Sequence, residues 1–347
     1  MNEETRTEVG SLGEFALIDH LTKNNETRNA GTILSVGDDA AVIDHFGKQT
    51  VVTTDMLVEG IHFDLAYTPL RHLGYKSVVV NLSDVYAMNA IPQQLTMSIA
   101  FSNRFSVEAL AELYEGVYAA CRYYDVDLVG GDTTSSQKGL IISVTALGEV
   151  APGHFVTRSG AKKGDLICVS GDLGSAFLGL TLLEREKRIW METQGVQPDF
   201  ENQKYIVQRI LKPEARKNII GFFAEKNIKP TAMLDVSDGL SSDLLHICEK
   251  SGCGSVLYEE KIPINEDARQ FAYKLELDPT ACALSGGEDY ELLFTMAQTE
   301  YEAVSQHPDI SIIGYIAEPE KGNKLITKGG SAHDLIAQGW NPINVKG

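Results

Sequence analysis

Strand and helix patterns alternate along this chain on both sides of one turn-forming cluster, Ala-Pro-Gly-His at residues 151–154. Before the cluster, Gln94–Phe101 has an apolar side chain at every second position, which is typical of a half-buried strand. After it, Leu166–Ser170 is a short apolar run followed by helical patterns. This alternation predicts an α/β (α+β) protein with mixed sheets flanked by helices. We expect two domains, residues 1–150 and residues 151–347.

Three further stretches are predicted as helices. Phe15–Lys23 has apolar residues on one helical face behind a capping-box pattern. Pro69–Met88 is long and mixed in polarity, with a proline at its start. Gln203–Lys226 is predicted as one continuous helix.

Charge and composition exclude several classes of protein. The 347 residues carry 48 acidic and 30 basic side chains, a formal net charge of −18, which disfavours nucleic acid and anionic membranes as partners. No apolar run approaches the roughly 20 residues that span a bilayer, and the first ten residues lack the pattern of a signal peptide. The five cysteines are scattered and form no CxxC pair. These features predict a cytoplasmic protein with free thiols.

The common phosphate-binding and hydrolytic motifs are missing from the sequence. It contains no GxxxxGK[ST], no GxGxxG after a strand, no HExxH and no GxSxG. The eight histidines do not cluster. A protein of this kind that handles phosphates would have to do so through metal ions held by carboxylates.

Five short segments combine aspartate with glycine, serine or threonine. We expect the first in a loop, the third on the 69–88 helix, and the others where strands end. They are Gly37-Asp38-Asp39-Ala40, Thr53-Thr54-Asp55, Asn81-Leu82-Ser83-Asp84, Gly130-Gly131-Asp132-Thr133-Thr134 and Asp235-Val236-Ser237-Asp238-Gly239. Magnesium prefers such hard oxygen ligands, with water and substrate phosphates completing an octahedron. Each aspartate alone could equally be a turn former or a helix cap.

Taken in order, these segments, the second of them extended to residue 63, and two others resemble the thiamine-monophosphate kinases of the aminoimidazole-ribonucleotide-synthetase-like superfamily. The resemblance extends from Glu14 to about Trp340. The additional matches are Thr-Thr-Asp-Met-Leu-Val-Glu-Gly-Ile-His-Phe at 53–63, Thr-Arg-Ser-Gly-Ala at 157–161 and Gly-Gly-Glu-Asp-Tyr-Glu-Leu at 286–292. It implies a two-domain fold, transfer of phosphate from ATP to thiamine monophosphate with several magnesium ions, and a homodimer paired through the N-terminal domain.

The resemblance also implies roles for individual residues. The implied metal ligands are Asp39, Thr53, Thr54, Asp55, Asp84, Asp132, Asp235 and Asp238. The implied ATP contacts are Gly131, Asp132, Arg158, Ser237 and Tyr114, and the implied contacts to thiamine monophosphate are His62, Glu288 and Trp340. Asp55, Asp132 and Arg158 would act in catalysis. The family more often has serine where this chain has Thr53, and either hydroxyl can bind a metal.

The chemistry of these residue types fits those roles. A phosphate acceptor is already an anion, so the task is to bring two anions together in line, which magnesium ions assist. Arg158 has a planar fork suited to phosphate oxygens, and Glu288 and Trp340 suit a cationic ring. Without the resemblance, Arg158 would be interpreted as a surface ion-pair residue, His62 as structural and Trp340 as a core aromatic.

Two alternatives stay open at this point. The first is another ATP-using member of the superfamily, of the selenophosphate synthetase or aminoimidazole ribonucleotide synthetase type. Selenophosphate synthetases would carry a reactive Cys or selenocysteine near the N-terminus, whereas the first cysteine here is Cys121. The second is a non-catalytic nucleotide-binding protein, which would bind ATP without forming ADP.

Overall fold

The computed structural model describes residues 32–34, 38–45, 47–102, 104–193, 200 and 203–337. The helix expected at Phe15–Lys23 and the expected acceptor contact Trp340 lie outside the described residues.

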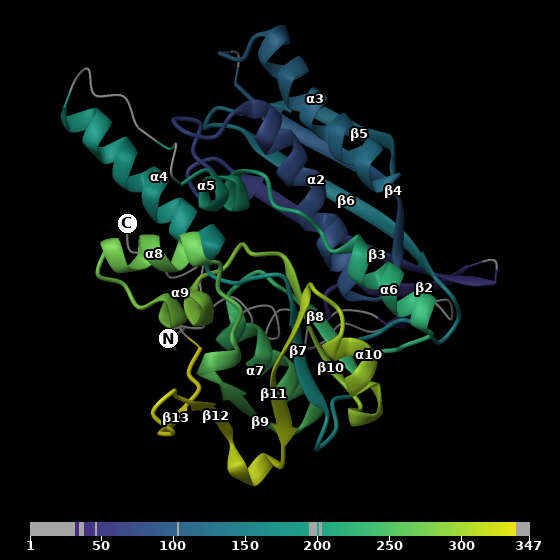
Figure 1. Ribbon diagram of the computed structural model, residues 1–347. Helices are drawn as coiled ribbons and strands as arrows, with labels where there is room; N and C mark the ends of the chain where they lie inside the picture. The colour runs from purple at the N-terminus through teal and green to yellow at the C-terminus, as the bar shows by residue number, and fades with distance from the viewer. Residues whose placement is uncertain are drawn as a thin grey trace, which may run out of the picture.

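The N-terminal half forms a six-stranded sheet covered on one face by two helices, α2 (Leu70–Ala87) and α3 (Val107–Tyr124) (Figure 1). Its strands, in spatial order, are β1 (Thr32–Leu34), β2 (Ala41–His45), β3 (Lys48–Val58), β6 (Ile141–Val150), β4 (Ile91–Phe101) and β5 (Asp127–Ser135). All neighbours are antiparallel except β4 and β5, which α3 connects. Alternate side chains of each strand therefore face the helices.

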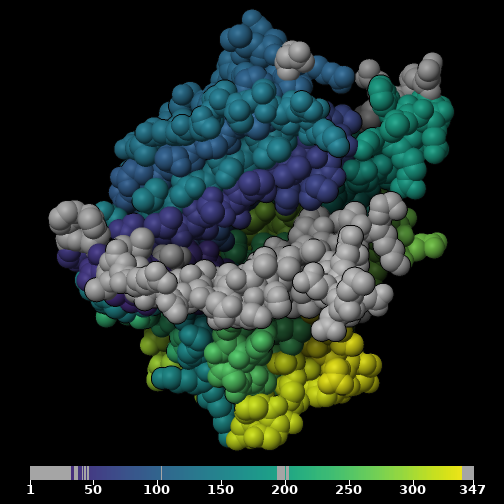
Figure 2. Space-filling view, turned by 180° about the vertical axis from the view of Figure 1, so that it is seen from behind, coloured from purple at the N-terminus to yellow at the C-terminus, as the bar shows by residue number. Residues whose placement is uncertain are grey.

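The C-terminal half forms a seven-stranded mixed sheet. Its strands, in spatial order, are β13 (Ala332–Asp334), β12 (Asn323–Ile326), β9 (Gly254–Tyr258), β11 (Ile310–Ala317), β7 (Leu166–Ser170), β10 (Glu291–Met296) and β8 (Ala232–Val236). Its helices are α4 (Ser175–Glu192), α5 (Lys204–Leu211), α6 (Lys217–Lys226), α7 (Leu240–Ser251), α8 (Glu266–Lys274), α9 (Pro279–Ser285) and α10 (Tyr301–Ser305). Two mixed sheets flanked by helices confirm the predicted fold class, and Figure 2 shows the two halves as an upper and a lower lobe. No helix in the described ranges is both long and apolar enough to cross a bilayer.

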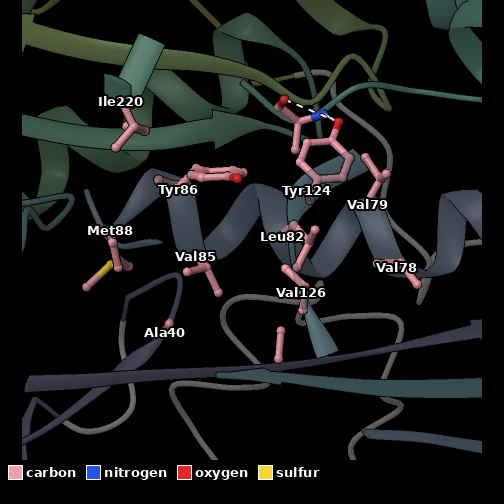
Figure 3. Packing of buried hydrophobic residues seen from close by; sticks show 14 of the residues in the cluster. Ala40, Val78, Val79, Leu82, Val85, Tyr86, Met88, Tyr124, Val126 and Ile220 are labelled. Carbon is pink, nitrogen blue, oxygen red and sulfur yellow. Dashed lines mark hydrogen bonds between the residues drawn. The ribbon is translucent and has the colours of Figure 1, made fainter. Parts of the chain in front are cut away.

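Helix α2 is enclosed from Leu73 onward, and 14 of its 18 residues are buried. Val85 points toward the sheet, whereas Tyr86 points the opposite way, toward Ile220 of α6 (Figure 3). Both belong to one apolar cluster that continues into β10 of the C-terminal half. The buried residues of α2 also include polar ones, Lys76, Asn81 and Ser83, so packing encloses polar as well as apolar sides of the helix. The helix predicted at 69–88 is thus confirmed, and it fixes the two halves to each other.

The single helix predicted over Gln203–Lys226 is wrong, because the chain forms α5 and α6 with a break at Pro213. Proline lacks an amide hydrogen and its ring clashes with the preceding turn of a helix. The segment between α5 and α6 packs against the end of α3. There the Ala215 amide donates a hydrogen bond to the Tyr124 hydroxyl at 2.8 Å, which is drawn as a dashed line in Figure 3.

Three of the aspartate segments lie inside strands rather than after them. Thr53–Asp55 lies within β3, Asp132 within β5 and Asp235 within β8. The strands continue through these residues because the backbone stays paired with the neighbouring strand, as Asp55 is with Val144 and Asp235 is with Leu292.

Two glycines allow α2 and α3 to cross closely. A Cβ at Gly74 would lie 1.9 Å from the Leu113 carbonyl oxygen, and one at Gly116 would lie 1.9 Å from that of Arg71.

We predict that Gly74→Ala and Gly116→Ala each lower the free energy of unfolding by about 1–3 kcal/mol, the usual effect of overpacking. Gly221→Ala on α6, where a Cβ meets nothing within 4 Å, is the control and should raise it by about 0.5–1 kcal/mol. Denaturant unfolding would measure all three, and a neutral effect at both crossing glycines would contradict the close approach.

Candidate active site

Three carboxylates from separate parts of the chain meet between the two halves. Asp39 comes from the bend before β2, Asp84 from α2 and Asp235 from β8. One oxygen of each lies within 4.8 Å of the others. Hydroxyl groups support two of them, because Thr53 Oγ1 donates to Asp84 Oδ2 at 2.6 Å and Ser83 Oγ donates to Asp235 Oδ2 at 2.6 Å. We call Asp39, Asp84 and Asp235 the carboxylate cluster.

Strand β3 adds Asp55 on the same side as Thr53, since side chains two residues apart share a face. The Asp55 amide donates to Asn81 Oδ1 of α2 at 3.0 Å, which ties the strand to the helix. The Thr54 side chain points the other way, and its hydroxyl donates to the Val144 carbonyl at 3.0 Å. Of the metal ligands predicted on β3, Thr53 and Asp55 lie on the face of the carboxylate cluster, and the Thr54 hydroxyl lies on the opposite face.

Burial and mutual repulsion make Asp84 and Asp235 of the carboxylate cluster costly to ionise. Burial raises the pKa of Asp84 well above its ordinary value, and repulsion from Asp55, Asp235 and Asp39 adds to the shift. Although Asp84 as a residue is half-buried, its carboxyl group lies on the buried side. Burial followed by repulsion from Asp39 raises the pKa of Asp235 to about 7. A bound cation would relieve both effects.

Arg158 reaches this cluster from the segment that follows residue 150. Its guanidinium forms an ion pair with Asp39, in which Nε donates to Oδ1 at 3.1 Å. Its amide donates to both carboxylate oxygens of Asp38 at 3.1 Å. Burial, ahead of repulsion from Asp39, raises the pKa of Asp38 to about 6. The arginine predicted to bind phosphate thus lies beside the predicted metal ligands.

The donor set fits magnesium. Asp39 Oδ2 is buried and has no hydrogen-bond partner among the described residues. Carboxylate and hydroxyl oxygens are the hard ligands that this ion prefers. Asp39, Asp84, Asp235 and Thr53 would hold the ion, with Asp55 next to them. Asp238 lies three residues beyond Asp235 and its amide donates to Asp243 at 3.2 Å.

A second group of side chains surrounds Glu288. Its carboxylate forms an ion pair with Lys76 of α2 and accepts a hydrogen bond from the Tyr290 hydroxyl at 3.2 Å. His62 Nδ1 accepts from the Val58 amide at 3.1 Å, so the neutral ring carries its hydrogen on Nε2. Burial lowers the pKa of His62, Glu288 opposes the shift and Lys76 adds to it. Two of the predicted acceptor contacts, His62 and Glu288, are therefore close enough to influence each other.

The chain around Glu288 is held in an unusual conformation. Glu288 and Tyr290 have φ values of 69° and 53°, and a Cβ at Gly287 would lie 2.1 Å from the Ser237 carbonyl oxygen. The Glu288 amide donates to that same oxygen at 2.8 Å. The Gly-Gly-Glu-Asp-Tyr segment is thus fixed directly against Ser237, a predicted ATP contact. Residues in such conformations cluster at functional sites.

The next acids of this segment have structural roles. Asp289 is completely buried and accepts hydrogen bonds from the Gly174 and Ala176 amides, at 2.7 and 3.2 Å, at the start of α4. Glu291 is buried and pairs with Arg209 and Arg216. Only Glu288 of the three acids faces the candidate site.

Three predicted nucleotide contacts lie away from the carboxylate cluster, Gly131 and Asp132 on β5 and Tyr114 on α3. Gly131, Asp132 and Tyr114 line a cavity of about 430 Å³ at the outer edge of the sheet. Asp132 is in register with Ser98 of β4, which pairs with Ser143 of β6 and in turn with Met56 of β3. Three strand spacings correspond to about 14 Å. Met56 is 55% exposed, so this row lies on the face opposite the helices.

A larger cavity, of about 940 Å³, lies where β4 and β5 end and α3 begins. It contains none of the predicted site residues. Its size alone therefore does not make this cavity the candidate reaction site. The buried acids of the carboxylate cluster favour the junction of the two halves instead.

Several residues of the site were not predicted from the sequence. Lys76 and Asp243 were missed, and Asp38, Asn81 and Tyr290 were noted without a role. Asp243 accepts from the Asp238 and Gly239 amides at 3.2 and 3.1 Å, so it shapes the loop before α7. Its position four residues after Gly239 was a usable signal, since acids are favoured in the first turn of a helix.

Comparison with known proteins first defines the class. Residues 37–150 match the family model "AIR synthase related protein, N-terminal domain", and residues 162–323 match "AIR synthase related protein, C-terminal domain". A solved HypE structure in complex with ATP superposes with a TM-score of 0.67 at 21% identity, over 94% of this chain and 96% of that one, and shows the shared fold. The chain is thus an AIR synthase related protein, with both domains of that class.

More similar relatives define the family. The thiamine-monophosphate kinase of Bacillus subtilis is 33% identical over 95% of this chain and 99% of its own length, and that of Aquifex aeolicus is 36% identical over 92% and 97%. A solved structure described as "AaThiL complexed with AMPPCP and TMP" has a TM-score of 0.81 and 32% identity over 97% of this chain and 99% of that one. The chain belongs to the thiamine-monophosphate kinase family.

The raised carboxyl pKa values predict how pH acts on the metal-free protein. The folded state holds protons on Asp84 and Asp235 that the unfolded chain releases near pH 4, so stability should fall as pH rises from about 4 to about 7. Asp84→Asn should raise the Tm of the metal-free protein at pH 7.5 by several degrees, flatten this pH dependence and weaken stabilisation by Mg²⁺. Thermal melts at pH 5 and 7.5, with EDTA or Mg²⁺, would measure these effects.

Asp44→Asn, which removes an exposed acid of β2, is the control. It should leave the pH and Mg²⁺ dependence as in the wild type. An Asp84→Asn protein with wild-type melts under all four conditions would contradict the assignment of Asp84 to a cation site.

Proposed function

We propose that this chain transfers the γ-phosphate of ATP directly to thiamine monophosphate, with magnesium ions held by the carboxylate cluster. The observation that carries this proposal is the packing of Asp39, Asp84 and Asp235 within 4.8 Å of one another, with Asp39 Oδ2 unpartnered among the described residues. The names of the relatives support it, since the Bacillus subtilis protein is a thiamine-monophosphate kinase and the AaThiL structure is a complex with AMPPCP and TMP.

The residues of the site supply charge and position rather than a base. The acceptor phosphate is ionised near neutral pH, so its oxygen can attack without losing a proton first. Magnesium bound by Asp39, Asp84 and Asp235 would offset the repulsion between donor and acceptor phosphates. Arg158, freed in part from Asp39 by the ion, would bind phosphate oxygens through its planar fork. Glu288 would attract the cationic ring of the acceptor, next to His62.

A second copy of the chain completes the site in this proposal. Asp132 lies three strands from β3 and on the exposed face of the sheet, too far to act on the carboxylate cluster of the same chain, and Gly131 and Tyr114 line the same cavity as Asp132. A homodimer paired through the N-terminal domains would bring Asp132 of one copy to the carboxylate cluster of the other. Such a symmetric dimer has two equivalent shared sites.

The first test is product formation. Purified protein with ATP, Mg²⁺ and thiamine monophosphate should release ADP and form thiamine diphosphate in equal amounts, and EDTA should abolish both. Thiamine in place of its monophosphate should give no product. ATP binding without ADP release with the monophosphate would instead support a non-catalytic nucleotide-binding protein.

Mixing two inactive variants tests the shared site. Asp55→Ala and Asp132→Ala should each lower the rate of phosphate transfer by more than about 100-fold while the protein stays folded. When the two are unfolded and refolded together, half of the dimers are mixed and one of their two sites is intact, so activity should return to about a quarter of the wild type. Each variant refolded alone is the control. A mixture that stays inactive would contradict the shared site but not the reaction.

A further inference from the structure

Lys76 of α2 is a buried cation that the proposed reaction does not use. It is 3% exposed and is the one buried lysine among the described residues. Its ammonium group pairs with Glu288, whose side chain is 29% exposed. A buried ammonium group is costly unless it is paired, and a well-packed apolar residue would usually be at least as stable. Stability therefore does not explain the presence of the Lys76–Glu288 ion pair, and a functional role is the better explanation.

The contacts of Glu288 show what the pair achieves. Its backbone is fixed by the left-handed conformation and by the hydrogen bond to Ser237, and its Oε1 accepts from Tyr290. Lys76 holds Oε2 by an ion pair, yet this buried oxygen has no hydrogen bond of regular geometry in the described part of the chain. The carboxylate is thus oriented on both oxygens and retains acceptor capacity for a ligand.

Helix α2 also sets the distance between this pair and the carboxylate cluster. Lys76 and Asp84 are eight residues apart on one helix, which corresponds to about 12 Å along its axis. Because α2 is buried throughout, this spacing is rigid. A ligand that reaches the cluster with its phosphate would extend along α2 toward Glu288.

We infer that Lys76 is a positioning residue that makes the site select acceptors with a cationic ring. The inference rests on the proposed function and assigns the specificity of the same site. Lys76 balances and orients the Glu288 carboxylate while the acceptor is absent. A cationic ring then shares this oriented carboxylate, whereas a neutral ring of the same shape leaves it paired with Lys76 and gains nothing. Without Lys76, the buried carboxylate loses the partner that fixes its orientation.

The test compares two acceptors, thiamine monophosphate and an isostere with a neutral ring in place of the thiazolium. Wild-type protein should prefer the cationic acceptor in kcat/KM. Lys76→Met should reduce that preference by about 10-fold or more, mainly through a higher KM for thiamine monophosphate and less through kcat. Lys76→Arg, which retains the charge, should keep most of the wild-type preference for the cationic acceptor.

The double variant Lys76→Met/Glu288→Gln covers the case in which Lys76→Met fails to fold, because it removes both buried charges together. It should be folded and should treat the two acceptors nearly alike. A Lys76→Met protein that keeps the wild-type preference, or loses kcat equally with both acceptors, would overturn the inference. A double variant that keeps the preference would overturn it too. Absence of thiamine diphosphate formation by the wild type would instead refute the proposed function.

Discussion

The structure depends on holding several like charges together at the junction of its two halves. Asp84 of α2 and Asp235 of β8 are supported by hydroxyls of Thr53 and Ser83, and Arg158 pairs with Asp39. These contacts offset only part of the repulsion, since the pKa of Asp235 is still raised to about 7. A cation bound there would replace this repulsion with attraction, so the protein would be less stable without the ion than with it.

Helix α2 is the element through which this constraint acts. It contributes Asp84 and Ser83 to the acids, Asn81 to β3 and Lys76 to Glu288. The remainder of its surface is enclosed by the sheet on one side and by α6 on the other. Both sheets therefore contact the same rigid rod, which explains how residues far apart in the sequence reach the same site. Domain movement that displaced α2 would disturb every part of the site together.

Sequence patterns predicted the fold class because the periodicities of strands and helices are local. They also singled out the segments that contain Asp39, Asp84 and Asp235, whose setting among glycines and hydroxyls is visible in a short window, whereas the roles of these residues as metal ligands came from the family resemblance and stay a prediction. The separation of Asp132 from these acids was not predictable, since it depends on β6 lying between β3 and β4. The Lys76–Glu288 pair was missed for a similar reason, because nothing near Lys76 distinguishes it from a surface lysine. The break at Pro213 was visible in the sequence and was overlooked.

The most direct test of the central claim is a crystal structure with Mn²⁺ in place of Mg²⁺ and a non-hydrolysable ATP analogue. Manganese is located by its anomalous scattering and accepts the same oxygen ligands. The carboxylate cluster predicts at least one ion bound directly by both Asp84 and Asp235. Manganese bound only to the nucleotide phosphates, with Asp84 and Asp235 free of metal, would contradict the account.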